Sequence, residues 1–106
     1  MKSDALRGHL DAMVLASLEA GPRHGYAISE YLSRRSDGAL TVATGTLYPA
    51  LHRLEKAGWV TSEWSTVTGR RRRTYELTAS GQRALGDRRA EWAQTSSVVT
   101  AVLGGT

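Results

Sequence analysis

The sequence predicts a mainly α-helical fold that carries one small β-hairpin and ends in a long helix. Three observations predict it. Apolar residues recur at intervals of three and four between residues 4 and 57, which is the period of amphipathic helices. Between residues 59 and 77 the period changes to two and is interrupted by Thr68-Gly69, as in two strands joined by a tight turn. A helical pattern then resumes after Thr78 and continues to Leu103.

The composition is that of a single soluble domain with a basic surface. The chain has 106 residues, of which 41% are hydrophobic and 23% charged, and a domain of this size has a modest core of its own. The formal net charge is +4 and the isoelectric point is about 10.0, a balance that fits nucleic acid or acidic membranes as partners. Four of the fourteen Lys and Arg residues are consecutive, at Arg70 to Arg73.

Several classes of protein are excluded by what the sequence lacks. It has no cysteine, which rules out disulfides and cysteine-based zinc sites, and its three histidines have no ligands at metal-binding spacing. The N-terminal segment is interrupted by charges such as Asp4 and Arg7, unlike a signal peptide or a membrane span. No nucleophile–base pair or phosphate-binding glycine motif is present. We therefore expect a cytoplasmic protein that is not an enzyme and needs no cofactor.

The first helix is expected from a cap at Ser3 or Asp4 to about residue 20, before Gly21-Pro22. Its main apolar stripe contains Leu6, Leu10, Met13, Val14 and Leu18. Leu15 lies on the opposite side, so the helix is apolar over more than one face. We interpret the second apolar side as a contact with another subunit.

The second helix is expected from His24 to Ser36 and ends at Asp37-Gly38. Ala27, Ile28, Tyr31 and Leu32 form its inner face. The β-branched residues that follow predict a brief strand near residues 40–42.

The third helix combines an apolar stripe with a proline on its outward side. The inward residues are Leu47, Ala50, Leu51 and Leu54, and Gly58 ends the helix. Its start has two solutions. With Thr46 as the N-cap, Pro49 falls in the first turn, where no N–H partner is needed. With Thr44 as the N-cap, Pro49 costs one hydrogen bond, so the backbone argument favours the later start.

The hairpin and the last helix complete the order of elements. In the hairpin, Val60, Ser62 and Trp64 share one face, and strand alternation sends two of the four arginines to each side. Thr78 caps the last helix, where Leu85, Trp92 and Val99 recur every seven residues. A seven-residue apolar repeat on a terminal helix is typical of dimerisation.

Two helices joined by a short glycine-containing turn, followed by a hairpin, predict a winged helix-turn-helix. We assign residues 1–78 to this DNA-binding unit and residues 79–106 to a C-terminal dimerisation helix. In such an arrangement the second helix of the pair enters the major groove of double-stranded DNA. The alternative is a winged-helix module that binds protein or RNA without a regulatory ligand.

The motifs resemble the PadR family of bacterial transcriptional regulators. The family's Gly-Thr-Leu-Tyr-Pro-Ala-Leu matches residues 45–51 without a gap, and its Tyr-Glu-Leu-Thr-x-x-Gly run matches residues 75–81. The resemblance covers nearly the whole chain, and the single terminal helix is similar to the short subgroup of the family. It implies a homodimeric DNA-binding repressor, in some members with a pocket for a small aromatic effector.

The candidate DNA-binding residues lie on the second and third helices and on the hairpin. Gly45 lets the backbone approach the duplex, hydroxyls at a helix start suit phosphate, and Pro49 offers a rigid surface to a thymine methyl group. Each has a plainer interpretation: the outward face is only solvated, Tyr26 packs in the core, or Tyr48 is half core. The candidates are Tyr26, Thr44, Gly45, Thr46, Tyr48, Pro49, His52, Arg53, Arg70, Arg71, Arg72 and Arg73.

A second candidate site is the seam between two subunits. Trp92 on the last helix is suited to stack on a planar ligand, with Leu10, Val14 and Val99 lining the same space. The plainer interpretation of Trp92 is interface packing alone.

Overall fold

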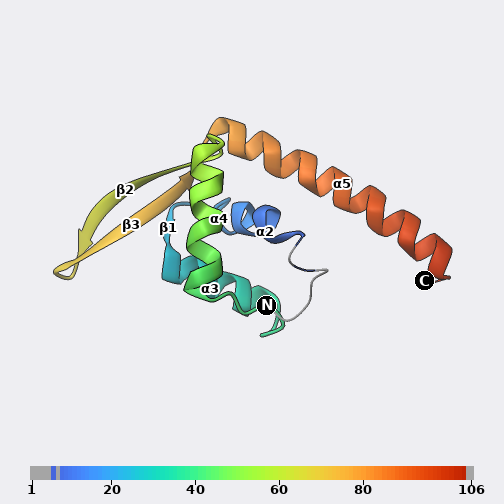
Figure 1. The fold of residues 1–106 in the computed structure, drawn as a ribbon, viewed down its shortest axis with the longest axis horizontal. Coiled ribbons are helices and arrows are strands. Elements are labelled where there is room, and N and C mark those ends of the chain that lie inside the picture. Colours follow the sequence, from blue (N-terminus) through green and yellow to red (C-terminus); the bar gives the residue numbers. More distant parts are fainter. Residues whose placement is uncertain (1–5, 7, 105–106) are drawn as a thin grey trace.

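The computed structural model describes residue 6 and residues 8–104. Its helices are α2 (Leu10–Ser17), α3 (Gly25–Arg35), α4 (Thr44–Lys56) and α5 (Ala79–Leu103), and its strands are β1 (Arg23–His24), β2 (Val60–Val67) and β3 (Arg70–Leu77). The predicted class, mainly α with a small hairpin, is confirmed. The molecule measures 54 × 28 × 21 Å, and it is elongated because the hairpin and α5 extend in opposite directions from the helices (Figure 1).

The core lies where α2, α3 and α4 meet, beneath the base of the hairpin and the first half of α5. All four inward residues predicted for α4 are buried, none more than 1% exposed. Ile28 and Leu32 of α3 and Val60 and Tyr75 of the hairpin join them. The inward face of α4 was therefore predicted correctly from its period. On α3, Ile28 and Leu32 are buried as predicted, whereas Ala27 and Tyr31 are half-buried.

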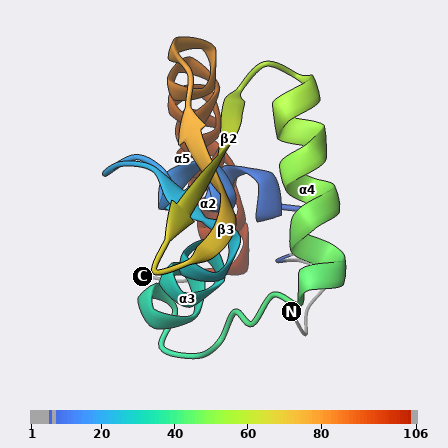
Figure 2. The same cartoon turned by 90° about the vertical axis from the view of Figure 1, so that its left-hand side faces the viewer.

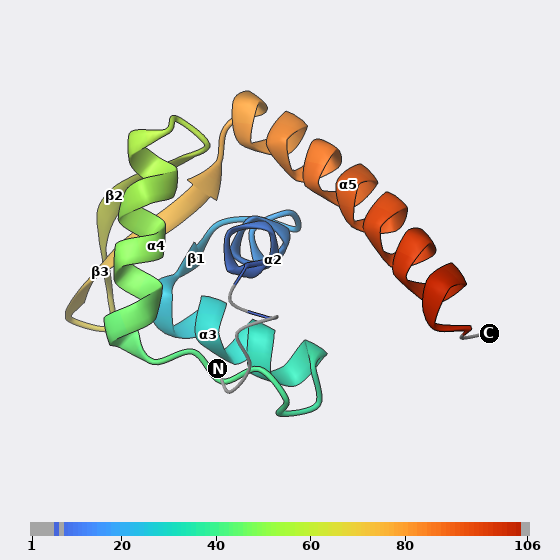
Figure 3. The same cartoon turned by 45° about the vertical axis from the view of Figure 1, so that its right-hand side comes forward.

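The first helix differs from the prediction. The expected cap at Ser3 or Asp4 lies outside the described residues, and the described helix begins at Leu10 and is capped at Leu18. Leu15 is completely buried in the chain's own core, so its assignment to a subunit contact was wrong. The reason is that α2 lies at the centre, with α3 and α4 on one side and α5 crossing on the other (Figure 3).

The strand expected at residues 40–42 was also wrong. This segment is a loop, and its side chains at Leu40 and Val42 are buried, which anchors the connection between α3 and α4. The Leu40 N–H donates to the Ser36 hydroxyl at 2.9 Å instead of to a neighbouring strand. The unpredicted strand is β1, which pairs antiparallel with β3 and gives a three-stranded sheet in the order β1-β3-β2.

Helix α4 begins three residues before the start that the backbone argument favoured. Ala43 is the N-cap, and its carbonyl accepts from the N–H groups of Thr46 and Leu47 at 3.0 and 2.9 Å. Pro49 is therefore inside the helix. Because proline has no N–H, the carbonyl of Gly45, four residues earlier, lacks its regular helical partner.

The hairpin forms as predicted. Strands β2 and β3 pair in register from Val60 opposite Leu77 to Val67 opposite Arg70. The two residues between the strands, Thr68 and Gly69, have φ angles of +54° and +76°. Positive φ at both positions characterises the tight turn whose twist matches that of paired strands.

Helix α5 is fastened at its first turn to the junction between α4 and β2. The Thr78 hydroxyl accepts from the Gly81 N–H at 3.0 Å, as predicted for a cap, and donates to the Gly58 carbonyl at 2.6 Å. The Thr78 N–H donates to the Trp59 carbonyl at 3.1 Å. Gly81 is buried against that same peptide group, so backbone meets backbone without room for a side chain.

We predict that Gly81→Ala destabilises the fold by about 1–3 kcal/mol, because the added methyl group would overlap closely packed backbone. Its Cβ would lie 2.8 Å from the carbonyl carbon of Trp59. Denaturant unfolding of the whole chain measures the effect. Gly86→Ala in the same helix is the matched control, since a Cβ there meets nothing within 4 Å and should stabilise the helix by about 0.5–1 kcal/mol. Equal effects of the two substitutions would contradict this packing.

Candidate nucleic-acid interface

The outward face of α4 is uncovered. Figure 1 shows α4 crossing over α2 and α3 with no element over its near side. The predicted residues on this face are all exposed: Thr44, Gly45, Thr46, Pro49, His52 and Arg53. Burial of the leucines on the opposite side fixes this orientation. The arrangement presents a continuous helical surface of hydroxyls, backbone and one apolar ring.

Tyr48 belongs partly to this surface and partly to the packing of α3 against α4. Its side chain is 44% exposed, and its ring lies against Gly25, where a Cβ would fall 2.7 Å from the Tyr48 Cζ atom. The half-core interpretation of Tyr48 is therefore supported. Gly25 is the first residue of α3 and Tyr48 belongs to the motif at residues 45–51, so their contact fixes this motif against the start of α3.

A shallow groove runs beside the first turns of α4, with a volume of about 860 Å³. One wall is the loop at residues 38–43, and the other is formed by Gly45, Thr46, Pro49 and Arg53. Arg53 does not point away freely, because its guanidinium contacts the Asp11 carboxylate of α2 at 3.0 Å. The Arg53 side chain is 58% exposed, and an ion pair this accessible is weak enough for a phosphate to replace it.

The four hairpin arginines are divided between two faces of the sheet, as strand alternation predicts. Arg71 and Arg73 lie over the Trp64 ring, with guanidinium carbons 4.8 and 5.4 Å from the ring centre. Arg73 also donates to the Ser62 hydroxyl at 2.9 Å and lies 3.6 Å from the Glu55 carboxylate of α4. Arg73 therefore holds the hairpin to α4.

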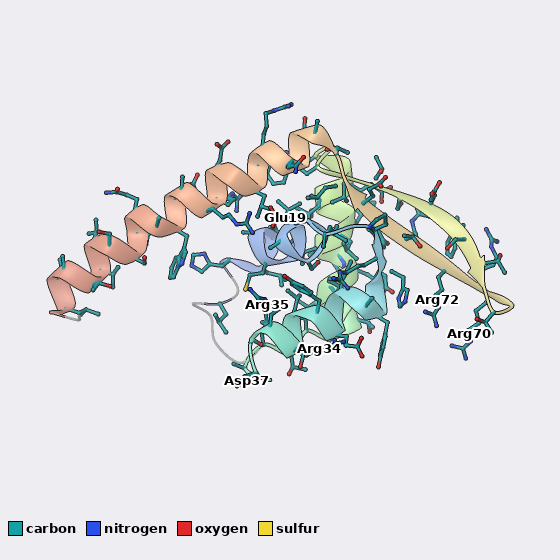
Figure 4. All side chains as sticks on the ribbon, turned by 180° about the vertical axis from the view of Figure 1, so that it is seen from behind. Glu19, Arg34, Arg35, Asp37, Arg70 and Arg72 are labelled. Atoms are coloured by element: carbon teal, nitrogen blue, oxygen red, sulfur yellow. The ribbon has the colours of Figure 1, made fainter. Side chains whose placement is uncertain are left out.

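Arg70 and Arg72 extend from the opposite face of the hairpin, toward α3 (Figure 4). The Arg70 side chain makes no hydrogen bond or ion pair with any residue that the structure describes. Arg72 lies 2.7 Å from Nε2 of His24 at the start of α3. These two arginines continue the basic surface from the helices to the tip of the hairpin.

His24 links the hairpin to α3, a role that the sequence did not reveal. Its Nδ1 accepts from the Ala27 N–H at 3.3 Å and so caps α3. The ring of Tyr26 stacks on His24 at 6.3 Å between centres. Tyr26 is 71% exposed, which contradicts the core-packing interpretation of this residue. Figure 2, seen from the side on which the hairpin projects, shows α3 and α4 beside the hairpin.

The neutral form of His24 is favoured by its surroundings. Burial lowers the pKa of His24, the nearby Arg72 charge lowers it further, and Glu30 opposes both. A neutral imidazole has one acceptor nitrogen, whereas the Ala27 N–H and the Arg72 guanidinium both approach as donors. When Nδ1 is the acceptor and caps α3, Nε2 carries the proton and cannot accept from Arg72. The Arg72 side chain is therefore not held by a full hydrogen bond while α3 is capped.

The predicted seam residues separate into two groups. Val14 is completely buried and Leu10 is 3% exposed, so the structure places both in the core of the chain itself and corrects their assignment to a space between subunits. Trp92 and Val99 are 54% and 48% exposed on α5. The first half of α5 packs on α2, where the Arg89 guanidinium contacts both Glu19 carboxylate oxygens at 2.8 and 2.9 Å.

The C-terminal part of α5 extends away from the rest of the chain (Figures 1 and 3). A cavity of about 450 Å³ opens between α2 and α5. Met13, Ala16, Leu85 and Trp92 contribute to its lining, and the Trp92 ring contacts the edge of the His9 ring, with 5.0 Å between centres. Trp92, which was predicted to stack on a ligand, therefore lines this cavity.

Two other kinds of site are absent from the described part of the chain. No group of three or more His, Asp or Glu side chains in residues 6 and 8–104 is arranged to hold a metal ion. Among the described helices, none combines the length and the apolar content needed to span a bilayer.

Comparison with known proteins agrees with this arrangement. The model of the "Transcriptional regulator PadR-like family" matches residues 14–87. The chain is 45% identical over 83 residues to the transcriptional regulator Rv3488 of Mycobacterium tuberculosis, which covers 77% of this chain and 71% of that protein.

Solved structures show the same fold. A transcriptional regulator from Clostridium thermocellum superposes with a TM-score of 0.87 at 32% identity, covering 93% of this chain and 97% of that one. A PadR family regulator from Eggerthella lenta gives a TM-score of 0.83 at 33% identity, over 94% and 86% of the two chains. The predicted winged helix fold is confirmed by these superpositions.

We predict that His24 makes stability depend on pH in the weakly acidic range. The pKa of His24 is lowered in the folded chain from its ordinary value of 6.5. Above pH 6.5 the cap is fully present; as the pH falls below 6.5, the unfolded chain binds a proton that the folded chain resists, so stability is lost down to the lowered pKa. Unfolding should be measured in denaturant between about pH 7.5 and pH 5.

The matched variant is His24→Asn, whose side chain caps helices well and does not titrate in this range. The other two histidines are present in both proteins, so their contributions cancel in the comparison. The variant should lose less stability than the wild type on acidification. Parallel pH curves for the two proteins would contradict the role of His24.

Proposed function

The chain belongs to the PadR-like family of transcriptional regulators, and from this premise we propose that it is a homodimeric repressor that reads a two-fold symmetric operator. Members of the family are transcriptional regulators and not enzymes. One observation carries the proposal: the uncovered face of α4 lies beside a hairpin with four arginines. A regulator of this kind acts where the DNA is, in the cytoplasm.

We assign the reading of bases to α4 and the positioning on phosphates to its surroundings. The exposed side of α4 enters the major groove with its N-terminal residues first. Thr44 contacts phosphate through its hydroxyl and N–H groups and Thr46 through its hydroxyl. Tyr48 and His52 border the same surface, and Pro49 contacts a thymine methyl group. Residues 1–78 thus form the DNA-binding unit, and residues 79–106 the dimerisation helix.

The hairpin contacts the phosphate backbone next to the groove. Arg70 and Arg72 extend from the same face of the hairpin (Figure 4), and both Arg72 and Tyr26 contact His24. Together they form one basic and hydrogen-bonding strip. Arg71 and Arg73 are stacked over Trp64, which holds their charge at a fixed place near α4. Contacts of this kind strengthen binding to every sequence and set the position of α4 in the groove.

Dimerisation is supported by the apolar surface of α5. Its exposed apolar residues are Trp92, which also lines the cavity, and Val98, Val99, Val102 and Leu103, between 48% and 80% exposed. An amphipathic helix with this much exposed apolar surface is stabilised by packing against a second one. Two copies related by a two-fold axis would then present two α4 helices to one face of the duplex.

We place a small planar effector in the cavity beside Trp92. The cavity combines an aromatic ring and apolar side chains with the charged groups of Arg88, Arg89 and Glu91, which is the usual composition of a small-molecule site. It lies between α2 and α5, so a ligand there would favour one orientation of α5 over another. A ligand that binds one orientation better shifts the population toward it.

Selection of bound duplexes from a random pool tests the function. The wild-type protein should enrich a palindrome whose half-sites are about 10 bp apart, one helical turn. Val99→Glu introduces a charge into the apolar surface of α5, and this variant should sediment as a monomer. In the selection experiment it should enrich single half-sites. Gln94→Glu, exposed on the same helix, is the control and should behave as wild type. Failure to enrich any duplex would contradict the proposal. Binding of RNA or of a protein in place of DNA would also contradict it.

We predict that Arg70→Ala weakens binding to selected and unrelated duplexes by a similar factor. Loss of one phosphate contact should reduce the slope of log affinity against log salt concentration by about 0.9. Titration of both duplexes at several salt concentrations measures this. Arg83→Ala removes an equal charge from an exposed position on α5, outside the hairpin, and should leave the slope nearly unchanged. A change of sequence preference with an unchanged slope would instead assign Arg70 to base reading.

A further inference from the structure

We propose that the backbone carbonyl of Gly45 is a base-reading group that accepts a hydrogen bond from an exocyclic amine of adenine or cytosine in the major groove. The proposal rests on the proposed function, since it requires α4 to enter that groove. It assigns sequence discrimination to the main chain at a position whose residue has no side chain. Three properties of α4 support it.

The first property is a carbonyl without its helical partner. Inside α4 each carbonyl normally accepts from the N–H four residues later. Position 49 is proline, which has no N–H and whose ring crowds the carbonyl of residue i−4. The Gly45 oxygen therefore keeps its accepting capacity for an external donor. Gly45 and Pro49 are both exposed, so this capacity lies on the surface that faces the groove.

The second property is that the fold does not require glycine at position 45. Its φ is not in the left-handed region, and a Cβ built there meets nothing within 4 Å. Gly25 and Gly81 differ, because their Cβ atoms would overlap Tyr48 and Trp59. Glycine inside a helix lowers its stability relative to alanine. A destabilising residue without a structural reason indicates that the space beside Gly45 is used by a partner.

The third property is the surrounding surface. Gly45, Pro49 and Arg53 line the same groove beside α4, together with Thr46. Arg53 is paired with Asp11, so its guanidinium is not the donor to the Gly45 carbonyl. With a volume of about 860 Å³, the groove leaves space beside the main chain of Gly45 for the edge of a base.

The chemistry determines which bases are accepted. In the major groove adenine and cytosine present an amino group, whereas guanine and thymine present carbonyl oxygens at the corresponding places. A carbonyl acceptor attracts the first pair and repels the second. We therefore expect one position in each half-site to prefer an amino base over a keto base.

Base analogues test this preference. In the duplex selected from the random pool, each adenine is replaced in turn by purine without its 6-amino group, and each cytosine by its analogue without the 4-amino group. At one position per half-site the affinity of the wild-type protein should fall by roughly fivefold, the effect of one lost hydrogen bond. The two arms of the experiment show whether the base is adenine or cytosine.

A matched pair at position 49 isolates the carbonyl. Pro49→Ala restores an N–H that occupies the Gly45 carbonyl and should abolish discrimination against the analogue. Replacement of Pro49 by lactic acid gives the same methyl side chain on an ester that has no N–H, and should retain the roughly fivefold discrimination. Both variants lack the proline ring, so a difference between them does not arise from the loss of its apolar surface.

Gly45→Ala gives an independent readout. The added methyl group should raise the unfolding temperature, because the helix gains propensity and meets no steric obstacle. It should also lower affinity for the selected duplex by roughly fivefold or more, because it keeps the base away from the main chain. An effect on the fold alone would give changes in stability and affinity of the same sign.

The outcomes separate this inference from the proposed function. If no duplex is selected, the proposed function itself fails. If a palindrome is selected but no analogue weakens binding, or if Pro49→Ala discriminates as the lactic acid variant does, the function stands and the carbonyl assignment is overturned. The carbonyl assignment is supported if Pro49→Ala loses discrimination against the base analogue and the lactic acid variant retains it.

Discussion

Burial of one face of α4 is the constraint on which the rest of the structure depends. Leu47, Ala50, Leu51 and Leu54 are at most 1% exposed, and each buried leucine contributes about 1.5–3 kcal/mol relative to exposure. These contributions fix the rotation of α4 about its axis. Because the helical period leaves no freedom to turn one face without the other, the residues of the opposite face must lie at the surface.

Polar contacts then place the hairpin relative to the helices. Arg73 joins the hairpin to Glu55 of α4, and Arg72 approaches His24 at the start of α3. These contacts are partly exposed, so each is weak compared with the burial that holds α4. The helices and the base of the hairpin, where Val60 and Tyr75 are buried and β1 pairs with β3, are therefore held firmly. The outer part of the hairpin makes contacts that a charged partner can replace. This division suits a surface in which one part reads bases and another adjusts to the backbone.

The elements with a strong local signal were predictable from the sequence. The inward residues of α4, the turn at Thr68-Gly69 and the cap at Thr78 follow from period, turn chemistry and capping preference. A two-residue turn at Thr68-Gly69 fixes the register of the two strands, so the pairing of Trp64 with Arg73 could also have been predicted. The exposed placement of the residues predicted for the α4 surface followed from the same helical period.

The remaining features depend on contacts between distant segments. Strand β1 has two residues, too few for any period, and exists because β3 offers it a partner. Leu15 was misassigned because the helices that pack around α2, namely α3, α4 and α5, all follow it in the chain. His24 and Arg72 are 48 positions apart, so neither residue indicates the other. The early start of α4 was missed because the hydrogen bond lost at Pro49 argued against a proline inside the helix. The carbonyl that loses this bond, that of Gly45, faces solvent and tolerates the loss.

The attachment of α5 at the Thr78–Gly81 turn makes the helix a lever. With 25 residues and a rise of about 1.5 Å per residue it is roughly 37 Å long, so a tilt of about 5° at its base moves the far end by about 3 Å. The base of α5 is held by two consecutive peptide groups, Gly58–Trp59 and Trp59–Val60, where α4 has just ended and the hairpin begins. Small angular adjustments at these peptide groups are thus amplified along α5, and a displacement of its free end returns to α4 as a rotation of only a few degrees.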